Sequence, residues 1–125
     1  MSVIEKKLQF QGSKGDKKIS ALFDSGATYS CIRQKLAEEL EILIPLTKTM
    51  KFSTADDKTT LTARYVTRLD FYISNDRFSD EFIVIEGLSD DIIIGAATLQ
   101  KWRMKLDFEH DAILYDPKVT RLRIG

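Results

Sequence analysis

The segment Ala21-Leu22-Phe23-Asp24-Ser25-Gly26-Ala27-Thr28-Tyr29-Ser30 is the most informative part of this sequence. Its first residues continue an apolar strand, and the Asp-Ser-Gly that follows suits no regular element, so we predict a tight loop from Asp24. Gly26 allows a backbone or a substrate to approach this loop closely. The triplet alone is weak evidence, because Asp, then Ser or Thr, then Gly arises by chance in roughly one chain in twenty of this length. A plain Asx-type turn is the simplest alternative.

A second informative segment, Asp91-Ile92-Ile93-Ile94-Gly95, lies nearer the C-terminal end. Three consecutive β-branched residues without alternation predict a strand that is buried on both faces, and Gly95 ends it. We predict a short helix over residues 96–101. Paired strands at 104–108 and 112–115 follow, joined around Glu109-His110-Asp111.

Together the two segments resemble the signatures of the retroviral and retrotransposon aspartic proteases, the retropepsins. The first resembles the active-site motif, including its two preceding apolar residues. The second, at the distance expected for the family, resembles the strand and helix that end a retropepsin domain. The resemblance covers about Ile4 to Tyr115. It implies an all-β, retropepsin-like acid protease barrel with one or two short helices, with residues 1–125 forming a single domain, and it implies aspartic endopeptidase activity.

Aspartic proteolysis needs two carboxyl groups that share one proton: one is ionised to activate water, and the other is protonated to polarise the scissile carbonyl. This chain has one Asp-Ser-Gly; the other near match, Ser89-Asp90-Asp91, lacks Gly and is interpreted as turn and strand-entry polarity. A single-copy site implies a homodimer in which Asp24 of each subunit faces its twin. We therefore predict Asp24 as the catalytic residue, a protein or peptide as substrate and a second copy as partner.

The resemblance assigns supporting roles in the active site to Ser25, Gly26, Ala27 and Thr28. It implies that the Ser25 hydroxyl joins hydrogen bonds beneath the dyad and that the Gly26 amide donates to the carboxylate. The same resemblance implies that Ala27 offers a small side chain beside a peptide-binding cleft.

The sequence departs from viral relatives at the positions that brace their dimer. Many viral members carry an acidic residue shortly after the triplet and an Arg after the later Gly, whereas Tyr29 and Ala96 stand in those neighbourhoods here. Family members join subunits through their termini, so we expect the interface in segments 3–10 and 120–124. Leu122 and Ile124 are the expected contacts.

A substrate-binding flap is expected in a hairpin with arms at residues 50–53 and 59–66. Its residues are Thr54, Ala55, Asp56, Asp57 and Lys58. Viral flaps are Gly-rich, but residues 52–60 contain no Gly, so we expect a stiffer or differently closing lid. A simple surface hairpin is the alternative interpretation. An alternative function is a non-catalytic retropepsin-like dimerisation or peptide-binding module, although the intact Asp-Ser-Gly favours the enzyme.

The remaining pattern is mostly short strands. Ile32, Leu36 and Leu40 recur at helical spacing, which predicts a helix over 33–40. Further strands are predicted at 3–11, 17–23, 69–73, 78–85 and 120–124.

Charge and hydropathy exclude several classes of function. Nineteen basic and nineteen acidic residues give a formal net charge of zero, so no global field favours nucleic acid or an anionic membrane. No apolar run approaches the roughly 20 residues of a membrane span. The first residues lack a secretory signal, and the single Cys31 fits a reducing compartment, so we expect a cytoplasmic protein.

Other candidate sites are weaker. Cys31 as a nucleophile would need a base, and His110 is the only histidine, so a small buried or half-buried residue is the better interpretation of Cys31. Asp107, Glu109 and Asp111 could bind a cation, but a solvated hairpin edge explains them and no loop has calcium-binding spacing. We predict no metal and no cofactor.

Overall fold

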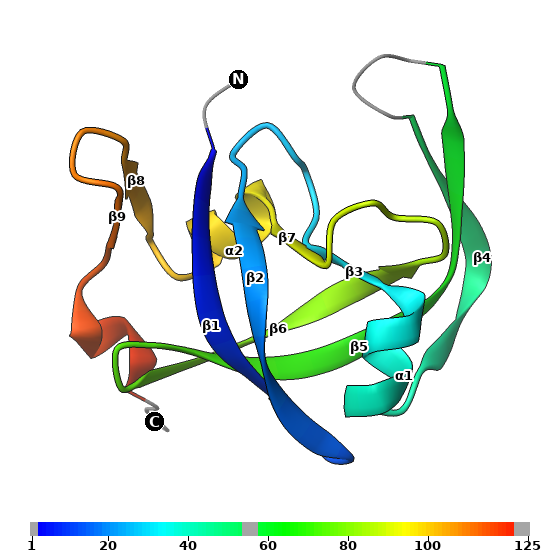
Figure 1. Cartoon of the computed structure of the whole chain (residues 1–125), viewed down its shortest axis with the longest axis horizontal. Coiled ribbons are helices and arrows are strands. Elements are labelled where there is room, and N and C mark those ends of the chain that lie inside the picture. The colour runs from blue at the N-terminus through cyan, green and yellow to red at the C-terminus, as the bar shows by residue number, and fades with distance from the viewer. Residues whose placement is uncertain (1–2, 54–57, 122–125) are drawn as a thin grey trace.

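The structure is a computed structural model that describes residues 3–53 and 58–121. Over these residues the chain is mostly β-strand, with two short α-helices and a final 3-10 helix (Figure 1). The elements in chain order are β1 (Ile4–Gly12), β2 (Gly15–Phe23), β3 (Cys31–Arg33), α1 (Gln34–Leu40), β4 (Ile44–Ser53), β5 (Thr60–Ile73), β6 (Asp76–Ile85), β7 (Ile92–Ile94), α2 (Ala96–Lys101), β8 (Lys105–Asp107), β9 (Ala112–Leu114) and η1 (Pro117–Thr120).

The main sheet closes on itself. Its strand order is β1-β2-β7-β3-β6-β5, and β5 pairs back with β1 through residues 70–72 against 9–11. β4 pairs with β5 outside this ring, and β8 and β9 form a separate hairpin. The expected all-β barrel with two short helices is therefore confirmed.

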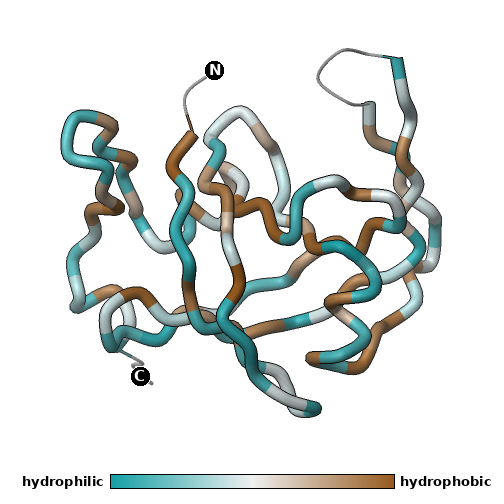
Figure 2. The backbone as a smooth tube through the Cα atoms, viewed as in Figure 1, coloured by the Kyte–Doolittle hydropathy of each residue, from teal (hydrophilic) through white to brown (hydrophobic). Residues whose placement is uncertain are grey.

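Alternation along the strands decides which side chains fill the barrel. In β2, Ile19, Ala21 and Phe23 are buried, whereas the intervening Ser20 and Leu22 are only half-buried. Such period-two alternation places successive side chains on opposite faces of a sheet. Figure 2 shows how apolar and polar positions are distributed along the backbone.

An aromatic cluster forms the centre of the main core. Phe71 stacks on both Phe10 and Phe78 with ring centroids 5.5 Å apart. Phe78 also meets Trp102 edge-on at 5.2 Å and Tyr115 at 5.0 Å. These two contacts fasten α2 and the segment after β9 to β6, because buried aromatic pairs contribute both area and directional packing.

The structure corrects the expected strands at 59–66 and 69–73, which form one continuous strand, β5. Thr67 and Arg68 pair with Phe82 and Glu81 without interruption. The polar Thr67 does not break the strand, although it is buried, because its hydroxyl donates to the carbonyl of Ile42 at 2.9 Å.

Two further expectations are wrong. Ile32 was expected to share helical spacing with Leu36 and Leu40 in a helix over 33–40. It lies instead in strand β3, and α1 begins only at Gln34. Thr120 was expected to begin a strand but belongs to η1, which the Asp116 side chain caps by accepting from the Lys118 amide at 3.0 Å. The rest of that predicted strand, with the expected interface contacts Leu122 and Ile124, lies outside the described residues. No helix within the described ranges has the length and apolarity of a membrane crossing.

Candidate active site

Asp24 lies directly after β2, where β2 runs parallel to β7. The register sets Phe23 against Ile94, and the amide of Asp24 donates to the Ile94 carbonyl at 2.9 Å. Asp24 follows the same alternation as Leu22, and both side chains are half-buried, opposite the fully buried Phe23. The carboxylate therefore lies outside the barrel core, at the C-terminal ends of two adjacent strands.

The loop that follows holds this carboxylate by a local hydrogen bond. The amide of Gly26 donates to Oδ1 of Asp24 at 2.8 Å, as the resemblance implied, and the amide of Ala27 donates to the Asp24 carbonyl at 3.1 Å. Ser25, Gly26 and Thr28 are exposed and Ala27 is half-buried. The loop thus orients one carboxylate oxygen while it leaves its own outer surface open.

The junction between β7 and α2 clamps the far side of this loop. The amide of Ala96 donates to the Ala27 carbonyl at 2.7 Å, and the amide of Ala97 donates to the Thr28 carbonyl at 3.1 Å. These bonds join the two sequence signatures directly. A segment near the N-terminal third and one near the C-terminal end therefore form a single unit.

A buried hydroxyl pair, which the sequence reasoning missed, completes the clamp. The hydroxyls of Ser30 and Thr98 are hydrogen-bonded at 2.5 Å, and both residues are buried. Ser30 Oγ also accepts from the Gly95 amide at 2.9 Å. Buried polar groups need partners, so a buried Ser and Thr that satisfy each other tie the loop to α2. Neither residue type has a sequence pattern that would have revealed the pair.

Close packing explains why glycine stands at position 95. A Cβ at this position would lie 2.5 Å from the Tyr29 carbonyl oxygen and 2.8 Å from the Ala27 carbonyl oxygen. Gly95 has an ordinary φ of −98°, so the requirement is steric rather than conformational. The second signature thus ends in Gly because the active-site loop lies directly against it.

Asp91 has a partner that the sequence reasoning did not identify. Its carboxylate forms an ion pair with the Arg33 guanidinium, and its carbonyl accepts from the Arg33 amide at 3.0 Å. Asp91 therefore connects the start of β7 to β3, in addition to its place in the turn before the strand.

The β4–β5 hairpin is present as expected, with residues 50–53 of β4 opposite 60–63 of β5. Of the expected flap residues, Thr54, Ala55, Asp56 and Asp57 lie outside the described residues, and Lys58 is exposed. Their role as a flap remains a prediction. On the described arm, the ring of Phe52 meets the ring of Tyr29 edge-on, with centroids 6.4 Å apart at 82°.

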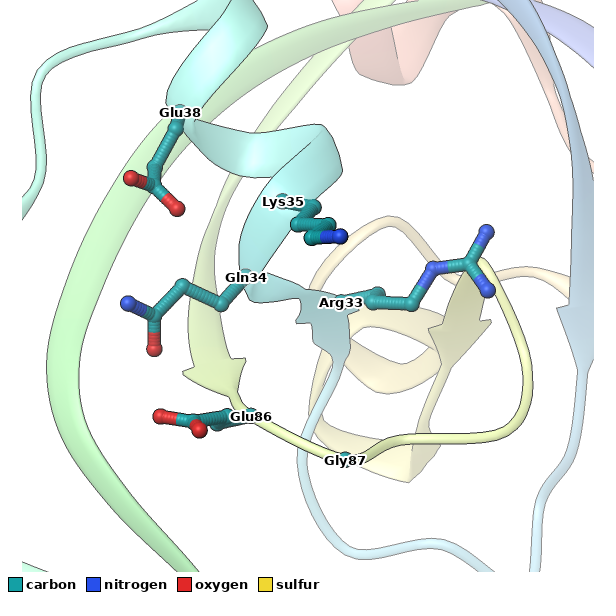
Figure 3. A pocket seen from close by; sticks show the side chains of 6 residues that line it. All are labelled: Arg33, Gln34, Lys35, Glu38, Glu86 and Gly87. Carbon is teal, nitrogen blue, oxygen red and sulfur yellow. The ribbon is translucent and has the colours of Figure 1, made fainter.

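Two surface hollows lie outside the Asp24 loop. One of about 190 Å³ reaches Leu22, on the face of β2 that carries Asp24, and is otherwise lined by Glu5, Ser20, Ser89, Asp90, Asp91 and Ile92. The other, of about 320 Å³, lies where α1 begins and β6 ends (Figure 3). Its lining residues are Arg33, Gln34, Lys35, Glu38, Glu86 and Gly87, of mixed charge.

Cys31 lacks the features of a nucleophile. Burial, reinforced by the negative charge of Asp90, raises the pKa of its thiol to about 12, although a hydrogen bond with the Ile93 backbone opposes this. The thiol is therefore protonated at neutral pH. His110 lies in the β8–β9 turn, where its Nδ1 is 2.8 Å from Oδ2 of Asp107.

Asp107, Glu109 and His110 offer ligand atoms within 4.8 Å of one another in that turn. Glu109 and His110 are exposed, and the third expected carboxylate, Asp111, pairs instead with Lys6 at 3.2 Å. The absence of a metal site here stays a prediction.

Comparisons with known proteins agree with this geometry. A family model described as aspartyl protease matches residues 10–98, which include Asp24 and Gly95. A search of the curated proteins finds no match. The retroviral protease-like domain of Ddi1 from Leishmania major is similar in structure, with a TM-score of 0.70, 18% identity, and coverage of 93% of this chain and 90% of that one. The EIAV protease, complexed with the inhibitor HBY-793, has a TM-score of 0.63 and 14% identity, covering 86% of this chain and 94% of that one. At these identities the structural likeness shows the fold alone.

Proposed function

Because this chain belongs to the aspartyl protease family, we propose that it is an aspartic endopeptidase that works as a homodimer. The observation that carries this proposal is the setting of Asp24: a half-buried carboxylate after a parallel strand, with one oxygen held by the Gly26 amide. Catalysis needs two such groups and the chain has one Asp-Ser-Gly. A second copy would supply the other Asp24 across a two-fold axis.

In the proposed mechanism the two Asp24 carboxyls divide the acid and base work. The ionised one takes a proton from water as the water oxygen attacks the scissile carbonyl carbon. The protonated one gives its proton to the carbonyl oxygen, which yields a neutral tetrahedral diol. A proton returned to the leaving nitrogen then allows the C–N bond to break, releasing an acid and an amine. The Gly26 amide would keep each carboxylate in the orientation that this exchange requires.

The proposed substrate is an extended peptide between the paired Asp24 loops and the β4–β5 hairpins. Backbone groups of such a peptide can pair with strand edges, and side-chain pockets then give selectivity. Residues 54–58 would close over the peptide as a flap. Support comes from the EIAV protease, a protein of the same fold that is complexed with an inhibitor.

The test is cleavage of an unbiased peptide mixture by the wild-type protein and by Asp24→Asn, read by mass spectrometry. Asp24→Asn should lower the cleavage rate by several orders of magnitude. The substitution removes both the general base and the general acid, each of which accelerates the reaction about 10²–10⁴-fold. Glu109→Gln, which neutralises an exposed carboxylate in the β8–β9 turn, is the matched control and should cleave normally.

Circular dichroism should show that Asp24→Asn keeps the fold. Cleavage that survives in a folded Asp24→Asn protein would refute the proposal. A folded wild-type dimer that retains peptides without cutting them would instead support the alternative, a non-catalytic peptide-binding module.

A further inference from the structure

The end of the β4–β5 hairpin has little strand support from the rest of the barrel. Residues 50–53 of β4 pair with 60–63 of β5, whereas the pairing of β5 with β6 begins only at Ala63. Among the described residues, the outer parts of β4 and β5 therefore form strand pairs only with each other. Figure 1 shows the arm rising beyond the barrel. Its position must depend on side-chain contacts.

Such contacts lie on one face of the arm, which packs against a smaller hydrophobic cluster of the barrel. Phe52 and Leu61 are directly opposite each other in the register, so they share a face, and both are half-buried. Leu61 reaches the turn after β6, with Cδ2 3.7 Å from the point where a Cβ on Gly87 would lie. Phe52 meets Tyr29 of the active-site loop edge-on.

Tyr29 is well placed to act as a support because its backbone is fixed while its side chain is open. Its carbonyl packs against Gly95, and its neighbours Thr28 and Ser30 are hydrogen-bonded to Ala97 and Thr98. The residue is nevertheless 47% exposed. An exposed ring that is anchored through its backbone and contacts a second element can transmit the position of the loop to that element.

We propose that Tyr29 is a positioning residue whose ring, packed on Phe52, fixes the distance between the β4–β5 hairpin and Asp24. The contact joins the loop that carries the carboxylate to the arm that borders the peptide. Its catalytic consequence rests on the proposed function, because a hairpin held at a fixed distance from the dyad would align a bound peptide with it. The contact itself does not depend on catalysis.

The first test measures amide hydrogen exchange at residues 50–53 and 60–63. Tyr29→Ala should accelerate exchange there about twofold to tenfold, which is the range expected when one aromatic pair is lost from a local opening equilibrium. Tyr29→Phe keeps the ring and should exchange like the wild type. Phe108, a similarly exposed aromatic residue at 49%, lies in the β8–β9 turn. Phe108→Ala is therefore the control, and it should leave exchange in the β4–β5 hairpin unchanged.

A double-mutant cycle tests whether the effect passes through Phe52. Once Phe52→Ala is present, Tyr29→Ala should cause no further acceleration, because the shared contact is already lost. Unchanged exchange in a folded Tyr29→Ala protein would overturn the proposal. Fully additive effects of the two substitutions would overturn it as well.

A third measurement separates this proposal from the proposed function. With a cleavable peptide, Tyr29→Ala should raise KM and lower kcat, and Tyr29→Phe should restore both constants. A wild type that cleaves while Tyr29→Ala keeps both constants would overturn the positioning role. If the wild type cleaves nothing but the exchange results hold, the endopeptidase proposal fails and the tie between hairpin and loop is supported.

Discussion

The loop around Asp24 is held directly by uncharged hydrogen bonds, whereas the Arg33–Asp91 ion pair joins β3 and β7, the strands that flank it. Where many viral relatives carry an acidic residue and an Arg, this chain has Tyr29 and Ala96, and the Ala96 amide bonds to the Ala27 carbonyl. The buried hydroxyl pair of Ser30 and Thr98 adds a second uncharged link. Uncharged links carry no ionic desolvation cost and are not screened by salt. These direct contacts of the loop should therefore be insensitive to ionic strength.

At the residue scale, Tyr115 should make stability depend on alkaline pH. Its hydroxyl donates to the Asp76 carboxylate at 2.5 Å and contacts the Ile73 carbonyl at 3.1 Å. Burial, together with the bond to Asp76, raises the pKa of Tyr115 from 10.0 to about 12. Between these two values the folded state keeps a proton that the unfolded state has lost, so the free energy of unfolding falls as pH rises.

The measurement is denaturant unfolding at several pH values between about 9 and about 12, for the wild type and for Tyr115→Phe. The variant should lose stability less steeply over this window, because Phe has no proton to retain. Cys31, whose pKa is also raised, contributes a slope of the same sign to both proteins, so the difference between them is the quantity to compare. Equal slopes would contradict the prediction.

At the element scale, the β7–α2 junction and β3 together determine where the active-site loop lies. β3 is a three-residue strand between β6, to which it is parallel, and β7, to which it is antiparallel. The loop after Asp24 leads straight into this strand. It is therefore held at its start by β2, at its end by β3 and along its back by Gly95 and α2.

Gly95→Ala should destabilise the protein by about 2–3 kcal/mol, because the added methyl would press on the Tyr29 and Ala27 carbonyls and force the loop outward. Gly15→Ala is the matched control, since its nearest neighbour would be the Glu39 carbonyl oxygen at an ordinary 3.7 Å. It should change stability by less than about 0.5 kcal/mol. Urea unfolding measures both. If both substitutions changed the free energy of unfolding by similarly small amounts, the loop would be able to move away from a Cβ at position 95 without cost, which would contradict the prediction.

At the scale of the whole molecule, the proposed homodimer makes a prediction about mixed subunits. Asp24→Asn chains should pair with wild-type chains, and such heterodimers would hold only one carboxylate of the dyad. A tenfold excess of Asp24→Asn should therefore lower wild-type cleavage about tenfold, as random pairing requires by mass action.

The control for this experiment is the same excess of an unrelated protein, which should leave cleavage unchanged. On dilution, the cleavage activity should fall in parallel with the dissociation of dimers that sedimentation measures. Wild-type activity that resists the excess of Asp24→Asn, in a sample shown to exchange subunits, would mean that each chain works without a partner.

Features with a local physical origin could be predicted from the sequence. The Asp24 loop follows from residues that suit no regular element, and β7 follows from three β-branched residues in a row. The helix at residues 34–40 follows from apolar spacing and differs from the expected range by one residue. The hydrogen bond from the Gly26 amide to Asp24 joins residues two apart, so the family motif was sufficient to anticipate it.

Only the tertiary structure decided the features in which residues distant in sequence meet. The spacing of Ile32 predicts a helix, but Ile32 pairs with β6 on one side and with β7 on the other. Strand pairing in the tertiary structure thus outweighs the local pattern. The Ser30–Thr98 bond and the Tyr29–Phe52 contact join segments with no shared pattern. Alternation and motifs report which residues turn inward or form a loop, whereas closure of the barrel determines which of them become neighbours.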